Sequence, residues 1–266
     1  MYTISDRIGH SMGLSDSGTV AAVVLGGGGG GDALAQRAGV AAKALAPLQG
    51  RPMAAYVLDA LAASHCTEHI TYVGPIEGLE PAWDAHVPAG SRLADSLALG
   101  FGAALAQAPG RRLLALTADI PWVTASAVDT FVSGAEVVDL VYPVIPRAVA
   151  EAQFPNQERT FVKVHDGHFT GGNLVLLSPQ TVPVLLSFVD RLYRGRKNPL
   201  ALASLFGYDI VAKLLMGRVR IAELEARAAR ILGISVSAYI SQDASLGADV
   251  DKLEHLGAPP RGMNAP

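Results

Sequence analysis

The chain has 266 residues, half of them hydrophobic, with 21 basic and 24 acidic residues and a net charge of −3. This length and apolar content predict one or two folded domains with a substantial core and argue against a disordered protein. The charge offers no broad basic surface, so we expect neither nucleic acid nor an anionic membrane as a partner. The single cysteine, Cys66, excludes intrachain disulfides and cysteine-cluster metal sites and favours the cytoplasm.

The ends of the chain are expected to be flexible tails, at residues 1–18 and 257–266, around a single domain at 19–256. Residues 1–18 contain no apolar segment long enough for a secretion signal. The longest stretch without Asp, Glu, Lys or Arg runs from Gly167 to Val189. Because glycine, asparagine and proline interrupt it, we expect a buried strand followed by a helix there, not a membrane span.

Predicted strands and helices alternate through the first half of the chain. The apolar, β-branched run at 19–25 predicts a buried parallel strand, and residues 51–64 predict a helix. A strand at 69–74, a helix at 91–108 and a strand at 111–121 follow. This order predicts a three-layer, doubly wound, mostly parallel α/β sheet, whose ligands bind beyond the carboxyl ends of the strands.

The pattern changes beyond residue 135. Strands are expected at 137–146, 159–164 and 170–177, with the turn "HDGH" joining the last two, which predicts an antiparallel or mixed extension of the sheet. Residues 180–232 are expected to form a mainly helical insertion or subdomain, before a last strand at 234–240.

Six consecutive glycines, residues 26–31, follow the first strand directly. Glycine permits positive φ and close backbone approach, so successive N–H groups can hold phosphate oxygens. At the end of a buried strand, such a tract favours a phosphate-binding turn over a flexible linker. Lys43, downstream of the turn, can add a positive charge.

Carboxylates stand at two other positions that suit this site. Asp119 follows a buried strand and can either bind Mg²⁺ or cap the next helix. Asp249 and Asp251 lie near the end of the chain, and Asp251 can also cap a following helix. Residues at i and i+2 of an extended segment point to opposite sides, so we expect only one of this pair to share a site with Asp119.

The order of these motifs resembles the MobA-like nucleotidyltransferases, which have a GT-A-type α/β fold. The matching segments are Lys43-Ala44-Leu45, Gly50-Arg51-Pro52, Asp119-Ile120-Pro121, "GGNLVLLSP" at 171–179 and Asp249-Val250-Asp251. The resemblance covers residues 19–256. The chain departs from the family where Asp32-Ala33-Leu34 replaces the usual basic residue after the glycines, a residue for which Arg37 is a candidate substitute.

The resemblance implies transfer of a nucleoside monophosphate from an NTP to a small phosphorylated, anionic acceptor, with release of pyrophosphate and with Mg²⁺ or Mn²⁺ as cofactor. Lys43 and Asp119 are the implied catalytic residues, and Asp119 and Asp251 the implied metal ligands. Implied nucleotide contacts are Leu25, Gly26, Gly27, Gly28, Gly29, Lys43 and Ser96. Implied acceptor contacts are Gly171, Gly172 and Asn173. A homodimer is compatible with this family.

Three other functions stay open on the residues alone. The glycines formally satisfy the Gly-x-Gly-x-x-Gly pattern of dinucleotide-dependent oxidoreductases, but the acidic residue expected about 20 positions later is missing. A nucleotide-sugar-dependent glycosyltransferase usually has Asp-x-Asp where this chain has Ala118-Asp119-Ile120. A noncatalytic nucleotide-binding protein is the third alternative. Cations that could meet an anionic acceptor are Lys163, Arg194, Arg196 and Lys197.

Overall fold

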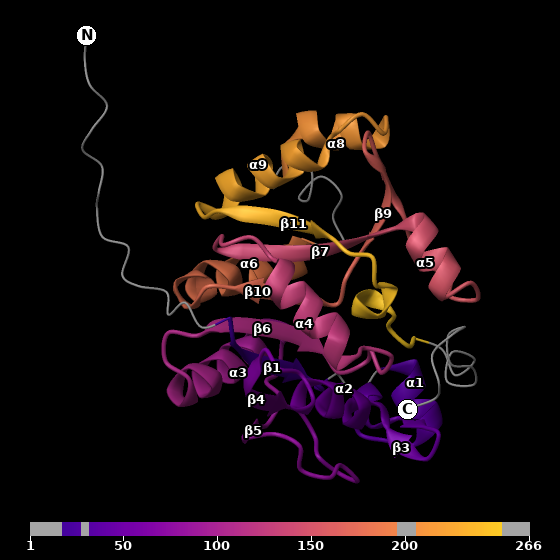
Figure 1. Ribbon diagram of the computed structural model, residues 1–266, viewed down its shortest axis with the longest axis vertical. Coiled ribbons are helices and arrows are strands. Elements are labelled where there is room, and N and C mark those ends of the chain that lie inside the picture. Colours follow the sequence, from indigo (N-terminus) through magenta and orange to yellow (C-terminus); the bar gives the residue numbers. More distant parts are fainter. Residues whose placement is uncertain (1–17, 28–31, 196–205, 252–266) are drawn as a thin grey trace.

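The computed structural model describes residues 18–27, 32–195 and 206–251 (Figure 1). Several predictions lie outside these residues: both tails except Gly18, Gly28 and Gly29 of the glycine turn, Arg196 and Lys197, and a helix after Asp251.

The centre of the described structure is a mixed sheet of nine strands (Figure 1). In spatial order the strands are β5 (Ala85–Val87), β4 (Thr67–Val73), β1 (Val20–Leu25), β6 (Arg112–Thr117), β10 (Leu174–Leu177), β7 (Leu140–Pro146), β9 (Gly167–Gly171) and β8 (Val162–Val164), with β11 (Val236–Ile240) beside β7. Strand β1 is parallel to both of its neighbours, whereas β10 is antiparallel to β6 and β7. Two short strands, β2 (Pro47–Leu48) and β3 (Arg51–Pro52), pair separately.

Helices cover both faces of the sheet, as the sequence predicts. The helices are α1 (Ala33–Ala38), α2 (Met53–Ala62), α3 (Leu93–Gln107), α4 (Ala125–Gly134), α5 (Arg147–Gln153), α6 (Val182–Gly195), α8 (Tyr208–Leu215) and α9 (Ile221–Leu232), with short 3₁₀ turns η1 (Lys43–Leu45), η2 (Pro179–Thr181) and η3 (Ala244–Gly247). Helices α2 and α4 pack on one face through Leu58 and Phe131, and α3 and α6 pack on the other through Phe101 and Leu185. The predicted three-layer α/β fold with a helical C-terminal region is therefore confirmed.

Strand β1 shows why the sheet is covered on both sides. Its residues alternate between the two cores: Ala22 and Val24 join the α2 and α4 side, and Ala21 and Val23 join the α3 side. All four are fully buried. A continuous apolar run is therefore needed in this strand, since neither face meets water.

The strand expected at 170–177 is wrong as a single element, because the chain forms β9 and β10 with a break at Gly172 and Asn173. At the break the N–H of Gly172 donates to the carbonyl of Pro143, and that of Asn173 donates to Leu246. The chain here leaves its place beside the end of β7 and enters between β6 and β7. A Cβ on Gly172 would lie 2.8 Å from Pro143 Cγ, so this passage requires glycine.

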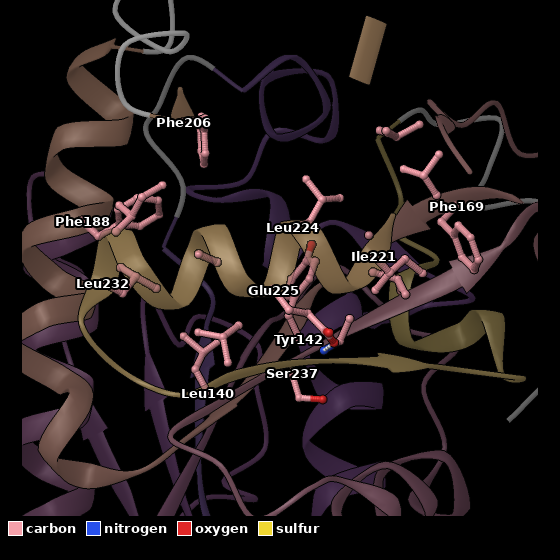
Figure 2. Close-up of a pocket in the computed structure, with 18 of the residues that line it drawn as sticks. Leu140, Tyr142, Phe169, Phe188, Phe206, Ile221, Leu224, Glu225, Leu232 and Ser237 are labelled. Carbon is pink, nitrogen blue, oxygen red and sulfur yellow. Dashed lines mark hydrogen bonds between the residues drawn. The ribbon is translucent and has the colours of Figure 1, made fainter. Parts of the chain in front are cut away.

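Helix α9 covers β11 and β7 but leaves an apolar cavity of about 660 Å³ between itself, α6 and the sheet (Figure 2). Phe188, Leu224 and Leu232 are among the lining side chains. The polar Glu225 in this wall accepts a hydrogen bond from the N–H of Ala238 at 2.7 Å. Among the described residues, no helix has both the length and the apolar character that a bilayer crossing requires.

Candidate active site

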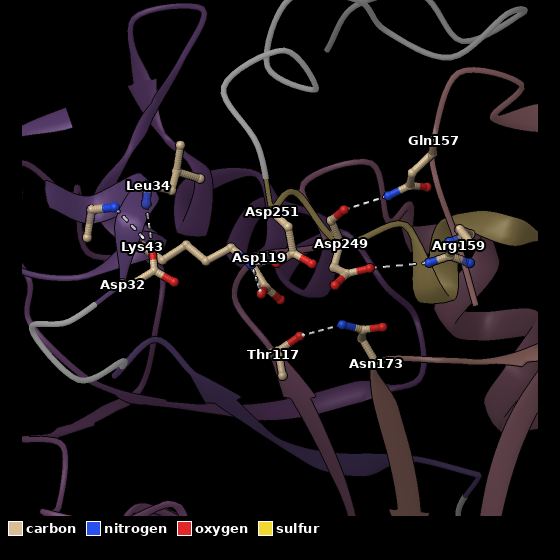
Figure 3. A network of polar contacts seen from close by, with 11 residues as sticks. Asp32, Leu34, Lys43, Thr117, Asp119, Gln157, Arg159, Asn173, Asp249 and Asp251 are labelled. Carbon is tan, nitrogen blue, oxygen red and sulfur yellow. Dashed lines mark hydrogen bonds and ion pairs between the residues drawn. The ribbon is translucent and has the colours of Figure 1, made fainter. Parts of the chain in front are cut away.

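Three carboxylates meet at the carboxyl end of β6 (Figure 3). Asp119 follows β6 directly after Ala118, whose N–H donates to the carbonyl of Leu25 at the end of β1. The carbonyl of Asp119 accepts a hydrogen bond from the N–H of Val250 at 2.9 Å, which fixes the C-terminal segment beside the strand end. One carboxylate oxygen each from Asp119, Asp249 and Asp251 lies within 4.8 Å of the other two.

The expectation that only one of Asp249 and Asp251 reaches Asp119 is wrong. The expectation assumed an extended segment, but the N–H of Asp249 donates to the carbonyl of Gly247 at 3.0 Å across Ala248. Ala248 has φ −83° and ψ 69°, the conformation of an inverse γ-turn. The chain thus turns sharply just before the pair, and the N–H of Val250 holds it against Asp119, where both carboxylates join the cluster.

Lys43 joins the cluster from the 3₁₀ turn η1, where its neighbours Ala44 and Leu45 are buried. Its Nζ lies 2.8 Å from Asp119 Oδ2 and also pairs with Asp251 Oδ1, and its side chain is only 13% exposed. Burial lowers the pKa of Lys43, but the negative charges of Asp119 and Asp251 outweigh burial and raise that pKa overall. Lys43 is therefore a fixed positive charge within the site.

The carboxylates remain crowded despite Lys43. Burial raises the pKa of Asp249, and repulsion from Asp251 and Asp119 raises it further. Among the described residues, the buried Oδ1 of Asp119 has no hydrogen-bond partner. Clustered carboxylate oxygens with one such unpaired atom fit Mg²⁺ or Mn²⁺, since hard divalent cations prefer oxygen ligands.

The first two glycines of the predicted phosphate turn are packed closely at the end of β1. A Cβ on Gly26 would lie 2.1 Å from Tyr72 Oη, and one on Gly27 would lie 2.3 Å from Ala89 Cβ. The N–H of Gly26 donates to Val73 at 2.8 Å, so this amide serves the sheet. Packing alone therefore explains glycine at both positions, and their contact with phosphate stays a prediction.

Asp32, which replaces the basic residue that the family resemblance implies, has a local role. Its Oδ1 accepts hydrogen bonds from the N–H groups of Leu34 and Ala35 at 2.9 and 3.0 Å, and so caps α1. Arg37 lies in the last turn of α1 and is exposed. The structure thus explains the aspartate without requiring a change in the chemistry of the site.

Ser96, one of the predicted nucleotide contacts, is buried in α3. Its Oγ accepts a hydrogen bond from the N–H of Gly90 at 3.0 Å. Ala89, the residue before Gly90, is the one that packs against Gly27. The structure therefore brings Ser96 and the glycine turn to the same loop, while its contact with a nucleotide stays a prediction.

The predicted acceptor residues lie where β9 passes into β10, the strand that neighbours β6 on the side away from β1. Asn173 Nδ2 donates to Thr117 Oγ1 at 3.4 Å, next to the end of β6 that carries Asp119. The hydroxyl of Tyr142 donates to the carbonyl of Gly172 at 2.8 Å. A Cβ on Gly171 would lie 2.3 Å from that hydroxyl, so glycine at this position allows the tyrosine to lie close.

Two residues near the cluster have no signal in the sequence. Gln157 Nε2 donates to the carbonyl of Asp249 at 2.5 Å, and Arg159 Nη2 lies 3.4 Å from Asp249 Oδ1. Both come from an irregular segment between α5 and β8, because the strand expected at 159–164 begins only at Val162, and no motif there points to the cluster. Of the cations considered from sequence, Lys163 lies exposed on β8, and the side chain of Arg194 lies outside the described residues.

The mixed α/β sheet, and the lysine that meets carboxylates at the end of β6, agree with the nucleotidyltransferases of GT-A-type fold that the motifs resemble. A sequence profile of the MobA-like NTP transferase domain matches residues 22–214. The chain therefore belongs to the MobA-like NTP transferase family, which confirms the resemblance found in its motifs.

Solved structures agree with this assignment. A hypothetical transferase from Thermus thermophilus is 40% identical, with a TM-score of 0.81 over 90% of this chain and 99% of its own. CMP:2-keto-3-deoxy-manno-octonic acid synthetase, solved with CTP, is 12% identical with a TM-score of 0.54 over 90% of this chain and 95% of its own. 4-diphosphocytidyl-2C-methyl-D-erythritol synthase from Anaerococcus prevotii DSM 20548 is 11% identical, with a TM-score of 0.52 over 91% and 95%. At such low identities, the likeness of the last two structures to this chain shows a shared fold alone. No curated protein matches the chain.

Proposed function

We propose that this protein transfers a nucleoside monophosphate from an NTP to a small phosphorylated acceptor, releases pyrophosphate, and requires Mg²⁺ or Mn²⁺. The observation that carries this proposal is the meeting of Lys43 with three carboxylates beside the glycine turn. Family membership supports it over an oxidoreductase.

The reaction is an in-line displacement at phosphorus. An acceptor oxygen attacks the α-phosphorus, the bond from that phosphorus to the α,β-bridging oxygen breaks, and pyrophosphate leaves with the bonding electron pair. Such a step depends on alignment and charge neutralisation more than on covalent chemistry by the protein.

A small number of side chains would provide this alignment and charge neutralisation. Asp119 and Asp251 would hold the divalent cation, which when bound neutralises phosphate oxygens and stabilises charge that develops in the transition state. Lys43 provides a positive charge beside the same carboxylates, and this charge would face the phosphates of the bound nucleotide and neutralise part of their charge. On the acceptor side, Asn173 offers an amide beside the end of β6.

The test is pyrophosphate release from each of the four NTPs with a panel of phosphorylated acceptors, with Mg²⁺, Mn²⁺ or a chelator. We expect Asp119→Asn to lower turnover at least 100-fold with an unchanged melting temperature in the absence of metal, because a cation ligand is lost. Asp59→Asn is the matched control, since that carboxylate is exposed and pairs with Arg51. Unchanged turnover in Asp119→Asn would contradict the proposal.

A further inference from the structure

Arg159 is a buried cation beside the carboxylate cluster. Its side chain is only 6% exposed, and among the described residues its Nη1 has no hydrogen-bond partner. Its ion-pair contact is with Asp249, at 3.4 Å from one amino group. A buried guanidinium is costly unless it is paired, so its place next to this carboxylate needs an explanation.

The loop that carries Arg159 holds Asp249 at two points. Gln157 binds the backbone carbonyl of Asp249, and Arg159 binds its side-chain Oδ1 (Figure 3). Figure 3 shows Lys43 on one side of the carboxylates and Arg159 on the other. Lys43 pairs with Asp119 and Asp251, so the two cations divide the three carboxylates between them.

The contact from Arg159 engages one oxygen of Asp249, and a carboxylate can accept at both of its oxygens. Without the loop, repulsion from Asp119 and Asp251 would favour rotation of this carboxylate away from the cluster. Outer residues that orient metal ligands commonly change metal affinity by about 10- to 100-fold when they are lost.

We propose that Asp249 is a third carboxylate ligand of the divalent cation, and that Arg159 is the positioning residue that holds it there. This inference rests on the proposed function, since it concerns the same cation site, but it goes beyond the pair Asp119 and Asp251. It makes the loop at 157–159 a part of the metal site.

The sign of the effect on metal affinity separates positioning from simple charge. If Arg159 acted only through its positive charge, its removal would tighten cation binding, because one source of repulsion would be lost. If it positions Asp249, its removal weakens binding. Arg159→Met removes the charge and the hydrogen bond but keeps a long side chain. Arg159→Lys keeps the charge but lacks the planar guanidinium group and its fixed N–H geometry.

The experiment measures Mn²⁺ affinity of the full chain without nucleotide, by calorimetry or by the electron paramagnetic resonance signal of free Mn²⁺. We expect Asp249→Asn and Arg159→Met each to weaken Mn²⁺ binding about tenfold. In the Asp249→Asn background, Arg159→Met should cause no further loss, because both changes remove the same ligand. Arg147→Met is the matched control, an arginine paired with Glu151 on the neighbouring helix α5.

Each result decides the question. Tighter binding or no change in Arg159→Met overturns the positioning role, and unchanged binding in Asp249→Asn overturns the third ligand. Melting curves without metal identify any variant that fails to fold. If Arg159→Met fails to fold, Arg159→Lys takes its place, and we expect its Mn²⁺ affinity to be lower than that of wild type. If wild type binds Mn²⁺ and Asp119→Asn does not, the proposed cation site stands even where the roles of Asp249 and Arg159 are overturned. If wild type binds no Mn²⁺, both the proposed metal dependence and the roles of Asp249 and Arg159 are overturned.

Discussion

At the scale of single residues, Lys43 contacts the same carboxylates that are proposed to hold the cation. Its ammonium lies against Asp119 Oδ2 and Asp251 Oδ1. A divalent cation at these oxygens must compete with that contact, and Lys43 would then be free to face phosphate. The lysine therefore stabilises the metal-free site, and under the proposed function it would act on the phosphates only once the cation is bound.

Lys43→Met should accordingly separate metal binding from turnover. We expect Mn²⁺ to bind several-fold more tightly, because a competing positive charge is removed, while pyrophosphate release falls at least 100-fold. The measurements are Mn²⁺ titration and steady-state turnover on the same preparation. Lys213→Met, which removes a half-exposed lysine paired with Glu223, should change neither. Weaker Mn²⁺ binding in Lys43→Met would count against the competition.

At the scale of elements, helix α3 reaches the sheet because small residues on its inner face allow close packing. A Cβ on Gly100 would lie 2.5 Å from Val23 Cγ1 and 2.8 Å from Val73 Cγ2, whereas a Cβ on Gly102 would meet nothing within 4 Å. The two glycines share a helix and differ in which face they occupy.

The same substitution should therefore have opposite effects at these two positions. Gly100→Ala should lower the free energy of unfolding by about 1–3 kcal/mol, because the added methyl overpacks the core. Gly102→Ala should raise it by about 0.5–1 kcal/mol, because alanine has the higher helix propensity. Urea unfolding of the two variants and wild type measures both values. Equal effects would show that α3 does not pack as described.

Helix α4 is tied to the loop after α2 by one carboxylate. Asp129 accepts hydrogen bonds from Ser64 Oγ at 2.6 Å and from the N–H of Cys66 at 3.0 Å. Burial raises the pKa of Asp129, but hydrogen bonds from Ser64, Cys66 and His65 outweigh it and lower that pKa from 3.8 to about 2. The ionised form is thus favoured in the folded state.

A carboxylate whose pKa is lower in the folded than in the unfolded state stabilises the fold at pH values above its unfolded-state pKa. For Asp129 this contribution is lost as the pH falls from about 4 toward 2. Asp129→Asn should lower the free energy of unfolding by about 1–2 kcal/mol at pH 6, and this deficit should shrink as the pH approaches 3. Urea unfolding of wild type and variant between pH 3 and 6 measures the difference. A deficit independent of pH would exclude a role for the charge.

At the scale of the whole molecule, the candidate site exists only in the folded chain. Lys43, Asp119 and Asp251 are distant in the sequence and meet because β1 and β6 are adjacent and the C-terminal segment returns to the end of β6. Repulsion among the carboxylates opposes this arrangement, and a bound cation relieves it. Cytoplasmic location, a homodimer and the absence of nucleic-acid partners stay predictions.

Cation binding should therefore stabilise the whole fold by mass action. At a Mn²⁺ concentration of about 100 times Kd, the free energy of unfolding should rise by about 2.7 kcal/mol and the melting temperature with it. A chelator should reverse the shift, and Asp119→Asn should not show it. Calorimetric melting of both proteins measures this, and an equal shift in both would place the bound cation elsewhere.

The sequence by itself determined the architecture, because the buried strands, the alternation with helices and the turn residues are local patterns. Its motifs also pointed to Lys43, Asp119 and Asp251, which the fold brings into contact. Only the tertiary structure placed Asp249 in the same cluster, since that depends on how the C-terminal segment docks against the end of β6, a contact between residues far apart in the sequence. Likewise, Arg159 gains its place from the path of an irregular loop across the end of the sheet, and no spacing along the chain encodes such a contact.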